Sequence, residues 1–382
     1  MAIASTPTPP SVEVLRDAIR RFLADAAPPS TCDAWLRGFD PELSRELGRQ
    51  GWIGMMVPRE WGGRGFGYVE RYVVMEELLA AGAPVAYHWF ADRQIAPTLL
   101  ASGNERLQRE LLPRICRGEL CFCIGISEPN AGSDVSAIAT RATPQGDDWV
   151  VDGQKVWTTG AQHAQYCHLV ARTDRHQDDP HRGLTEFVVP MDAPGITVRP
   201  IEDLSGEAHF AEIFFDGVVV EGWRMIGERG EGFRQIARQL DYERSGPERF
   251  SSTLPLLQAL LDHVRREALT GWEREIGELL ARLAALRAMS LDVARAMDGG
   301  APPSAGAALV KDLGATFEQD VVTVAREVIE DVEPAGAGGV APLSARLAEA
   351  LLHQASFTLR GGTAEVLREI VARRMLGLGR SS

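Results

Sequence analysis

The stretch Gly125-Ile-Ser-Glu-Pro-Asn-Ala-Gly-Ser-Asp-Val-Ser-Ala137 combines hydroxyl side chains with glycines. It holds the hydroxyls of Ser127 and Ser133 and the glycines at 125 and 132. Glycine leaves neighbouring backbone N–H groups accessible, and each serine adds a donor and an acceptor. The same residue types are also typical of ordinary turns. The stretch therefore indicates either a plain turn or a loop that binds a polar cofactor.

A second stretch, Gly153-Gln-Lys-Val-Trp-Thr-Thr-Gly160, follows soon after the first. It lies at the end of a β-type run that starts with Trp149-Val-Val151, and it places an aromatic ring beside two hydroxyls. An aromatic ring offers a flat apolar surface, and the hydroxyls add polar contacts at its edge. Taken alone, this stretch is also compatible with a turn.

Helical spacing of apolar residues flanks a region of short β-type runs. Apolar residues recur every three or four positions before residue 119 and again after residue 225. Three pairs between the β-type runs are predicted to be turns: Asp152-Gly153, Pro194-Gly195 and Asp216-Gly217. We predict an α+β multidomain protein with a disordered tail (1–10), an N-terminal helical domain (11–118), a central small β-barrel or sandwich (119–225) and a C-terminal four-helix-type bundle (226–382).

The charge balance excludes several classes of partner. The 382 residues include 40 Lys and Arg against 53 Asp and Glu, a formal net charge of −13. Such a chain is poorly suited to nucleic acid or to an anionic membrane surface. No apolar run approaches the roughly 18 residues that span a bilayer, and we find no signal peptide. The five dispersed cysteines favour a reducing cytoplasm over a disulfide framework, and no metal site is expected.

The two stretches, in this order between helical regions, resemble the acyl-CoA dehydrogenase family. Three further motifs extend the resemblance over nearly the whole chain: Pro190-Met-Asp-Ala-Pro-Gly-Ile-Thr-Val198, Phe214-Phe-Asp-Gly-Val218 and Gly361-Gly-Thr-Ala-Glu-Val-Leu-Arg368. The resemblance implies non-covalent FAD and α,β-dehydrogenation of an acyl-CoA, with electrons passed to an electron-transfer flavoprotein. The flavin site differs from a dinucleotide fingerprint, because no Gly-x-Gly-x-x-Gly follows a strand.

The resemblance also assigns roles to individual residues. It implies that Ser127 and the backbone at Ile124 and Ile126 hydrogen-bond the flavin pyrimidine, that Trp157 packs against the rings and that Thr159 lies near flavin N5. Further cofactor contacts are implied for Gly132, Ser133, Thr158, Thr363 and Glu365. Substrate contacts are implied for Ser133, Asp241, Arg244, Gly362 and Arg373. The N–H of Gly361 is expected to polarise the thioester carbonyl.

The reaction needs a base for the α-proton of the thioester. Most family members carry a glutamate where this chain has Gly361, so the resemblance to isovaleryl- and long-chain-type enzymes points to Glu243 in Leu240-Asp-Tyr-Glu-Arg244. Glu243 continues the apolar stripe of Phe233, Ile236 and Leu240, where a carboxylate is costly unless it is paired or used. We expect Arg244 to orient or pair with it.

Two alternatives to a catalytic Glu243 stay open. The first is a purely structural ion pair between Glu243 and Arg244. The second is Glu365, which lies at the start of the last predicted helix and is a rival base. A carboxylate at that place is also explained by the helix dipole.

Two segments that in family relatives serve the FAD of a neighbouring subunit differ here. Val264-Arg-Arg-Glu-Ala-Leu-Thr-Gly-Trp272 lacks the Phe-Gly of Arg-x-x-Phe-Gly, and Glu330-Asp-Val-Glu-Pro-Ala-Gly-Ala-Gly-Gly339 replaces Gln-x-x-Gly-Gly. The chain is therefore expected to form either a homodimer or homotetramer, or a heterotetramer with a paralogous subunit.

Three further readings of the activity remain. The first is a flavin oxidase or monooxygenase on the same fold. The second is a dehydrogenase of acyl-carrier-protein thioesters, and the third is a non-catalytic subunit.

Overall fold

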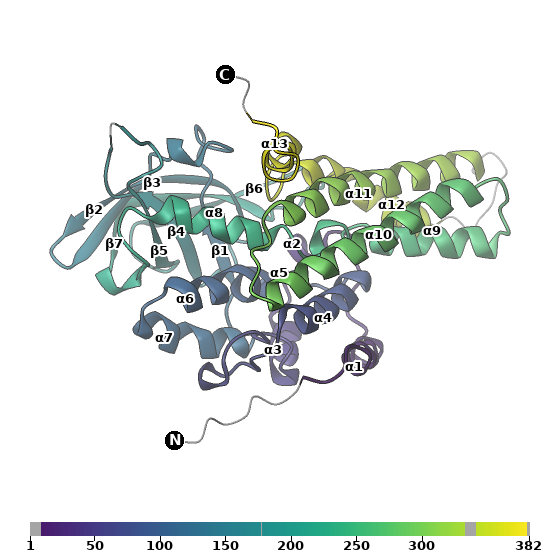
Figure 1. Cartoon of the computed structure of the whole chain (residues 1–382), viewed down its shortest axis with the longest axis horizontal. Coiled ribbons are helices and arrows are strands. Elements are labelled where there is room, and N and C mark those ends of the chain that lie inside the picture. The colour runs from purple at the N-terminus through teal and green to yellow at the C-terminus, as the bar shows by residue number, and fades with distance from the viewer. Residues whose placement is uncertain (1–8, 177, 333–340, 380–382) are drawn as a thin grey trace. The chain divides into compact units, whose positions relative to one another are not determined.

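Helices, strands and helices follow one another along the chain in the predicted order (Figure 1). The computed structural model describes residues 9–176, 178–332 and 341–379. The predicted α+β class, with helical regions before and after a strand-rich centre, is confirmed. The predicted disordered tail lies, up to residue 8, outside the described residues, and so does most of the segment 330–339.

The chain forms two compact units, each assembled from segments that are distant in the sequence. Unit 1 comprises Met1–Trp35, Gly67–Pro84 and Asp241–Ser382, and unit 2 comprises Leu36–Phe66 and Val85–Leu240. Two helices have residues in both units: α2 (Ala34–Arg37) and α8 (Gly232–Glu243).

Unit 2 is built on one eight-stranded sheet with the order β6-β7-β3-β2-β4-β5-β8, and β1 pairs in parallel with β4. The strands are β1 (Phe122–Gly125), β2 (Arg141–Gln145), β3 (Asp148–Thr159), β4 (Tyr166–Arg172), β5 (Leu184–Pro190), β6 (Ile196–Ile201), β7 (Phe210–Val220) and β8 (Met225–Ile226). The unit also contains α3 (Pro41–Gln50), α5 (Ala86–Phe90), α6 (Ala96–Ser102) and α7 (Glu105–Cys116).

Two of the three predicted turns were wrong. Pro194-Gly195 does separate β5 from β6, but Asp152-Gly153 and Asp216-Gly217 lie inside the long strands β3 and β7. The β3–β7 register shifts between Val151 and Gly153, and the Asp152 carboxylate accepts a hydrogen bond from the Gly217 N–H at 2.9 Å. Both glycines have positive φ, so the two pairs form an irregularity through which both strands continue.

Apolar side chains from the strands and from α8 form the interior of unit 2. The predicted stripe of α8 is confirmed, because Phe233, Ile236 and Leu240 pack with Val170 and Leu184 of the sheet. All five cysteines of the chain are buried, and burial raises the pKa of Cys121 to about 12. Such thiols behave as small apolar side chains.

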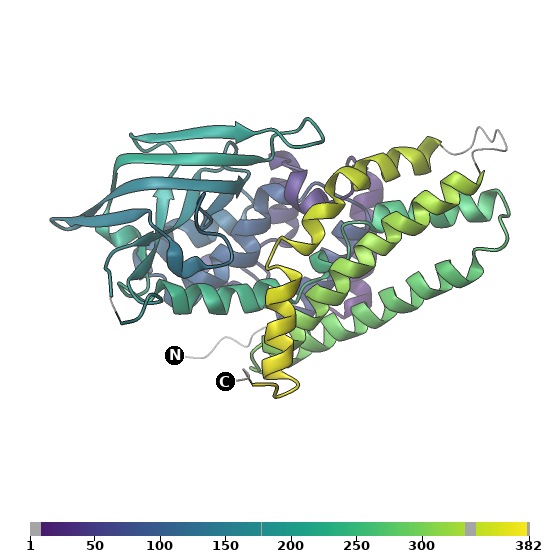
Figure 2. The same cartoon turned by 90° about the horizontal axis from the view of Figure 1, so that it is seen from above.

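Unit 1 is a helical assembly around one large apolar core. Its helices are α1 (Val12–Ala26), α4 (Tyr68–Ala80), α9 (Leu254–Arg266), α10 (Glu273–Asp298), α11 (Ser304–Val332), α12 (Ala341–His353) and α13 (Ala364–Arg374). Figure 2 shows α10, α11 and α12 side by side, in green to yellow. Leu257, Leu260, Phe317, Val321 and Leu347 lie at the centre of this core and are almost fully buried.

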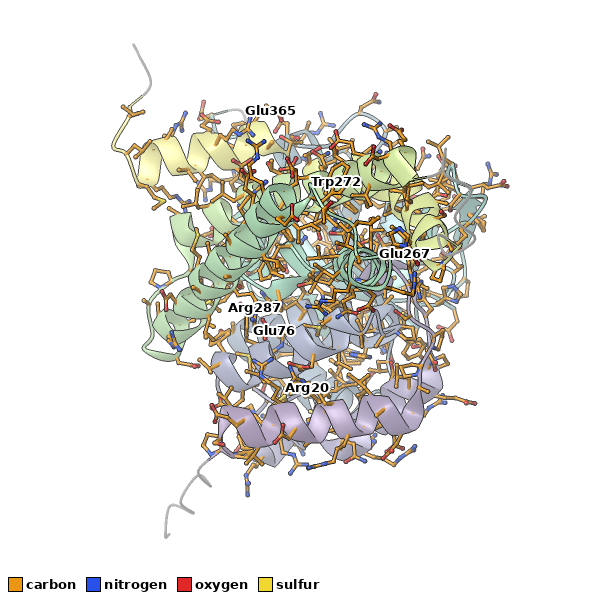
Figure 3. All side chains as sticks on the ribbon, turned by 90° about the vertical axis from the view of Figure 1, so that its right-hand side faces the viewer. Arg20, Glu76, Glu267, Trp272, Arg287 and Glu365 are labelled. Atoms are coloured by element: carbon orange, nitrogen blue, oxygen red, sulfur yellow. The ribbon has the colours of Figure 1, made fainter. Side chains whose placement is uncertain are left out.

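Charged side chains connect α4 to its neighbours within unit 1. Glu76 accepts a hydrogen bond from Arg287 Nε of α10 at 2.7 Å, and Glu77 accepts one from Arg20 Nε of α1 at 2.7 Å. Figure 3 shows Arg20, Glu76 and Arg287 at this side of the unit. Asp298 accepts from the Tyr68 N–H at 2.6 Å, so a carboxylate at the end of α10 caps the N-terminus of α4.

A second ionic cluster is more deeply buried in unit 1. Arg360 pairs with Asp33 and, at 3.1 Å, with Glu318, whose side chains are 2 % and 1 % exposed. Ser252 joins the cluster, because its N–H donates to Glu318 at 2.8 Å and its hydroxyl accepts from Arg360 at 2.6 Å. Arg360 therefore compensates two carboxylates that have left water.

We predict that Arg360→Met lowers the free energy of unfolding by about 3–5 kcal/mol, since it leaves Asp33 and Glu318 without their cation. Urea denaturation measures the change. The matched control is Arg368→Met, whose guanidinium is 65 % exposed beside Asp312 and should cost at most about 1 kcal/mol. Equal losses in the two variants would contradict the importance of the buried cluster.

Candidate active site

The structure brings the two motif stretches of unit 2 into direct contact. Ser127 lies in the loop after β1, and its carbonyl oxygen accepts a hydrogen bond from the Val156 N–H of β3 at 2.9 Å. This bond places Ser127 next to the residue that precedes Trp157. Gly132 and Ser133 are exposed further along the same loop. The first stretch is thus a loop held against β3 by a backbone hydrogen bond.

A buried lysine holds this loop in place. Lys155 Nζ donates to the Ile126 carbonyl at 3.0 Å and to Glu128 Oε1 at 2.7 Å, and its side chain has no exposed surface. The Glu128 carboxylate also accepts from the N–H groups of Ala139 and Thr140 at 2.7 and 2.9 Å. One ion pair therefore connects β3 with both ends of the motif loop.

Burial and pairing act against each other in this ion pair. Burial lowers the pKa of Lys155 to about 8, and the Glu128 carboxylate limits the fall. Burial alone raises the pKa of Glu128, but the charge and hydrogen bond of Lys155, together with the hydrogen bonds from Thr140 and Ala139, outweigh it and the pKa is lowered. Both groups are therefore stabilised in their charged forms by each other.

Trp157, near the end of β3, has an exposed side chain and an unusual backbone conformation. Its side chain is 60 % exposed, its φ is +57°, and the β3–β7 register shifts between Lys155 and Thr158. A non-glycine residue with positive φ is uncommon, and such strain clusters at functional sites. The Phe210 ring meets the Trp157 ring edge-on at a centroid distance of 6.0 Å.

The neighbours of Trp157 add hydroxyl groups. Thr158 is buried, and its Oγ1 has no hydrogen-bond partner within the described residues, while Thr159 is half-buried. An exposed aromatic ring next to hydroxyl-bearing residues fits a flat polar ring system such as the isoalloxazine of FAD.

In unit 1, Glu243 is the last residue of α8, and its side chain is 12 % exposed. The cation that pairs with its carboxylate is Arg249, in the 3₁₀ turn η5 (Pro247–Arg249). Arg249 Nη2 donates to Glu243 Oε1, and Arg249 Nε donates to the Glu243 carbonyl oxygen at 3.1 Å. The expected pairing with Arg244 is thus corrected to one with Arg249.

Gly361 lies against this ion pair. A Cβ atom at Gly361 would be 3.2 Å from Glu243 Oε1 and 2.7 Å from Arg249 Nη1, and φ is +67°. Arg244 Nε donates to the Gly361 carbonyl oxygen at 3.1 Å, and a Cβ at Gly362 would be 3.2 Å from Arg244 Nη2. The predicted residues Glu243, Arg244, Gly361 and Gly362 are therefore brought together within unit 1.

Other residues from the C-terminal motif lie on α13. The Thr363 hydroxyl caps this helix by accepting from the Val366 N–H at 3.5 Å. Glu365 is exposed in the first turn (Figure 3), and hydrogen bonds from its own backbone N–H and from Thr363 lower its pKa. Arg373 is exposed and pairs with Glu369. The side chain of Asp241 lies outside the described residues.

Sequence reasoning missed Arg249 and Lys155. One signal was available for the lysine, because Lys155 and Lys311 are the only two lysines of the chain. Both are almost fully buried. Arg249 gives no comparable signal, because arginines are frequent throughout the sequence.

Within the described residues, no group of three or more His, Cys, Asp or Glu side chains is arranged to hold a metal ion. Across the same residues, no helix has the length and apolar character needed to cross a membrane.

Comparison with known proteins identifies the family. Residues 9–119, 123–218 and 230–376 match the N-terminal, middle and C-terminal domains of acyl-CoA dehydrogenase. Acyl-CoA dehydrogenase IpdE1 of Mycobacterium tuberculosis is 36 % identical over 330 residues, which cover 85 % of this chain and 84 % of that protein. The chain therefore belongs to the acyl-CoA dehydrogenase family, whose members are FAD flavoproteins and oxidoreductases acting on CH–CH groups.

Solved structures agree with this assignment. The ChsE4-ChsE5 complex from Mycobacterium tuberculosis contains a chain with a TM-score of 0.83 and 29 % identity, covering 100 % of both chains. A structure described as Tcur3481-Tcur3483 steroid ACAD has a TM-score of 0.84 and 27 % identity, covering 99 % of this chain and 100 % of that one.

We predict that Lys155→Met weakens FAD binding about tenfold to a hundredfold, because it removes two charge-assisted hydrogen bonds that hold the motif loop. Titration of the apoprotein with FAD, followed by flavin fluorescence, measures the dissociation constant. Arg141→Met removes an exposed cation of the neighbouring strand β2 and serves as the control. A folded Lys155→Met protein that binds FAD within twofold of the wild type would contradict this role of the loop.

Proposed function

We propose that the protein catalyses FAD-dependent α,β-dehydrogenation of an acyl-CoA, with Glu243 as the base that removes the α-proton. The observation that carries the proposal is the position of the Glu243 carboxylate. It lies against the backbone of Gly361, where most family members carry their catalytic glutamate. A carboxylate from α8 therefore reaches the place that a side chain at position 361 would occupy.

The two groups at this place have complementary tasks. The α-proton of a thioester is weakly acidic, so a positioned carboxylate must accept it as it leaves. Negative charge then develops on the thioester oxygen, and the Gly361 N–H is the donor proposed to stabilise it. Bound FAD supplies the acceptor for the hydride that leaves the β-carbon. The hydrogen bond from Arg244 to the Gly361 carbonyl holds this backbone segment in place.

Glu365 is the weaker candidate for the base. Its carboxylate is exposed in the first turn of α13, and local hydrogen bonds stabilise its charged form. Exposure and a lowered pKa both reduce its basicity. Glu243, in contrast, is mostly withdrawn from water and is paired with Arg249.

The proposed residues for FAD are Ser127 with the backbone at Ile124 and Ile126, Gly132, Ser133, Trp157, Thr158, Thr159, Thr363 and Glu365. Those for the substrate are Ser133, Asp241, Arg244, Gly362 and Arg373. The exposed ring of Trp157 and the fixed loop at Ser127 support the first set. We further propose an electron-transfer flavoprotein as the acceptor of the electrons.

For the substrate, we propose a bulky, ring-bearing acyl-CoA. One structural relative, at 27 % identity, is described as a steroid ACAD.

We also propose that the chain functions as the catalytic subunit of a heteromer with a paralogous chain. The relative at 29 % identity over the full length belongs to the ChsE4-ChsE5 complex. In this chain, the segment 264–272 joins α9 to α10, and Figure 3 shows Glu267 and Trp272 there. Arg266 Nε donates to Glu267 at 3.1 Å, so this guanidinium already has a local carboxylate.

We predict that Glu243→Gln slows reduction of the bound flavin by about 10²–10⁴-fold without changing FAD content, because the α-proton loses its acceptor. Anaerobic stopped-flow mixing with acyl-CoA measures the bleaching of the flavin. The substrate is the fastest of a panel that spans straight-chain and fused-ring acyl groups, and we expect a fused-ring member. Glu278→Gln, at an exposed position of α10, is the control. Bleaching within a few-fold of the wild type would transfer the role to another residue, with Glu365 tested first.

We predict that the chain expressed alone contains less than one FAD per chain, and gains flavin and activity when a paralogous subunit is co-expressed. Light scattering gives the mass of the assembly, and absorbance gives the number of flavins per chain. A stable homo-oligomer with one FAD per chain and full activity would contradict the heteromer. Introducing Glu243→Gln into the assembled complex then distinguishes a catalytic from a non-catalytic subunit.

A further inference from the structure

Arg249 holds Glu243 at two points. One nitrogen of its guanidinium donates to the carboxylate of Glu243, and Nε donates to the backbone carbonyl of the same residue. The carbonyl belongs to the last turn of α8, where helix carbonyls lack partners within the helix. Arg249 thus fixes the side chain and the backbone of Glu243 together, which a single ion pair does not do.

Arg249 is itself held in place by other residues of unit 1. Its side chain is fully buried, and its guanidinium carbon lies 5.0 Å from the centroid of the Trp35 ring. The indole Nε1 of Trp35 donates to the Ser252 hydroxyl at 3.0 Å, and Ser252 belongs to the buried cluster of Arg360. A buried guanidinium on an aromatic ring gains cation–π attraction and loses freedom to rotate.

We propose that Arg249 is a positioning residue that holds the Glu243 carboxylate against the backbone of Gly361. This inference rests on the proposed role of Glu243 as the base. A base that must meet one carbon-bound proton needs a fixed orientation, because small displacements reduce the rate strongly. The two hydrogen bonds from Arg249 supply this orientation. The rest of the carboxylate stays available to accept the proton.

Other charged side chains lie around this ion pair within unit 1. Arg244 follows α8 and donates to the Gly361 carbonyl. Lys311 on α11 interacts electrostatically with Arg249, Arg360, Glu318 and Glu243.

The pKa of Lys311 on α11 depends on the charges of this cluster and can therefore be used to detect a change in them. Its Nζ donates to the Phe357 carbonyl at 2.6 Å. Burial and the positive charges of Arg249 and Arg360 lower the pKa of Lys311 to about 7, while Glu318 and Glu243 oppose the fall. Because the chain has only one other lysine, Lys155, isotope labelling of lysine side chains gives two signals. The signal of Lys311 is identified as the one that remains in the spectrum of Lys155→Met.

The first experiment measures kcat and KM for the holoenzyme and for Arg249→Met and Arg249→Lys. We expect Arg249→Met to lower kcat by about tenfold to a hundredfold with little change in KM, because the carboxylate loses the contacts that orient it. Arg249→Lys should recover only part of kcat, because lysine returns the charge but cannot donate to both groups of Glu243. Arg287→Met, which removes a guanidinium from the buried Glu76, is the control and should leave kcat unchanged.

The second experiment follows the labelled Lys311 signal through a pH titration and needs no activity. We expect the pKa of Lys311 to rise in Arg249→Met, because a nearby positive charge is lost, and to fall in Glu243→Gln, because a negative charge is lost. These opposite shifts also show that the variants are folded around the cluster.

The outcomes test the role of Glu243 as the base separately from the role of Arg249 as its positioning residue. If Glu243→Gln retains full activity, Glu243 is not the base and the proposed function fails. If Glu243→Gln is inactive but the kcat of Arg249→Met equals that of the wild type, Arg249 is not a positioning residue and the proposed function stands. An unshifted Lys311 signal in Arg249→Met would also overturn the inference. A kcat that falls in Arg249→Met at unchanged KM, and recovers in part in Arg249→Lys, supports it.

Discussion

The ion pair between Glu243 and Arg249 meets a physical requirement on which the proposed activity depends. A carboxylate that is largely withdrawn from water needs a cation or several donors, and otherwise becomes neutral. Arg249 provides that cation and a second hydrogen bond to the same residue. The end of α8, the backbone at Gly361 and the ring of Trp35 are all arranged around this guanidinium.

The same requirement shapes unit 2 at a different place. There the carboxylate is Glu128 and the cation is Lys155, and the pair fixes the loop that carries Ser127. In both units a buried cation sets the position of a backbone segment as well as of a carboxylate. Because breaking such a pair leaves an uncompensated charge, these contacts are costly to lose. They therefore fix the candidate residues within each unit more rigidly than surface pairs do.

The parts of the fold that follow from local spacing were predictable from the sequence. The stripe of Phe233, Ile236 and Leu240 is an example, since a helical period alone decides which side chains face the sheet. The Asp-Gly pairs at 152 and 216 show the limit of local signals. Asp-Gly suits a turn and a bulge equally, and only the pairing of β3 with β7 decides between them.

The candidate site was predictable where motifs carry it. The proximity of Ser127 to the Trp157 segment depends on a hydrogen bond between two motifs, and each motif is recognisable alone. Arg249 was not predictable, because its partners are the end of α8, Trp35 and the segment at Gly361. Trp35 and Gly361 are distant in the sequence. Glu243 is only six residues from Arg249, but it lies across the turn between α8 and η5, where no regular spacing applies. The nearer Arg244 was the natural but incorrect choice as partner of Glu243, and it contacts the Gly361 carbonyl.

The central claim is that Glu243 removes the α-proton of a bound acyl-CoA, and proton exchange tests it most directly. An acyl-CoA with no hydrogen on its β-carbon cannot lose a hydride, so exchange of its α-protons with D₂O reports the base alone. The holoenzyme should incorporate deuterium at the α-carbon, and Glu243→Gln should lower that rate by about 10²–10⁴-fold. Exchange by Glu243→Gln at the wild-type rate would contradict the account.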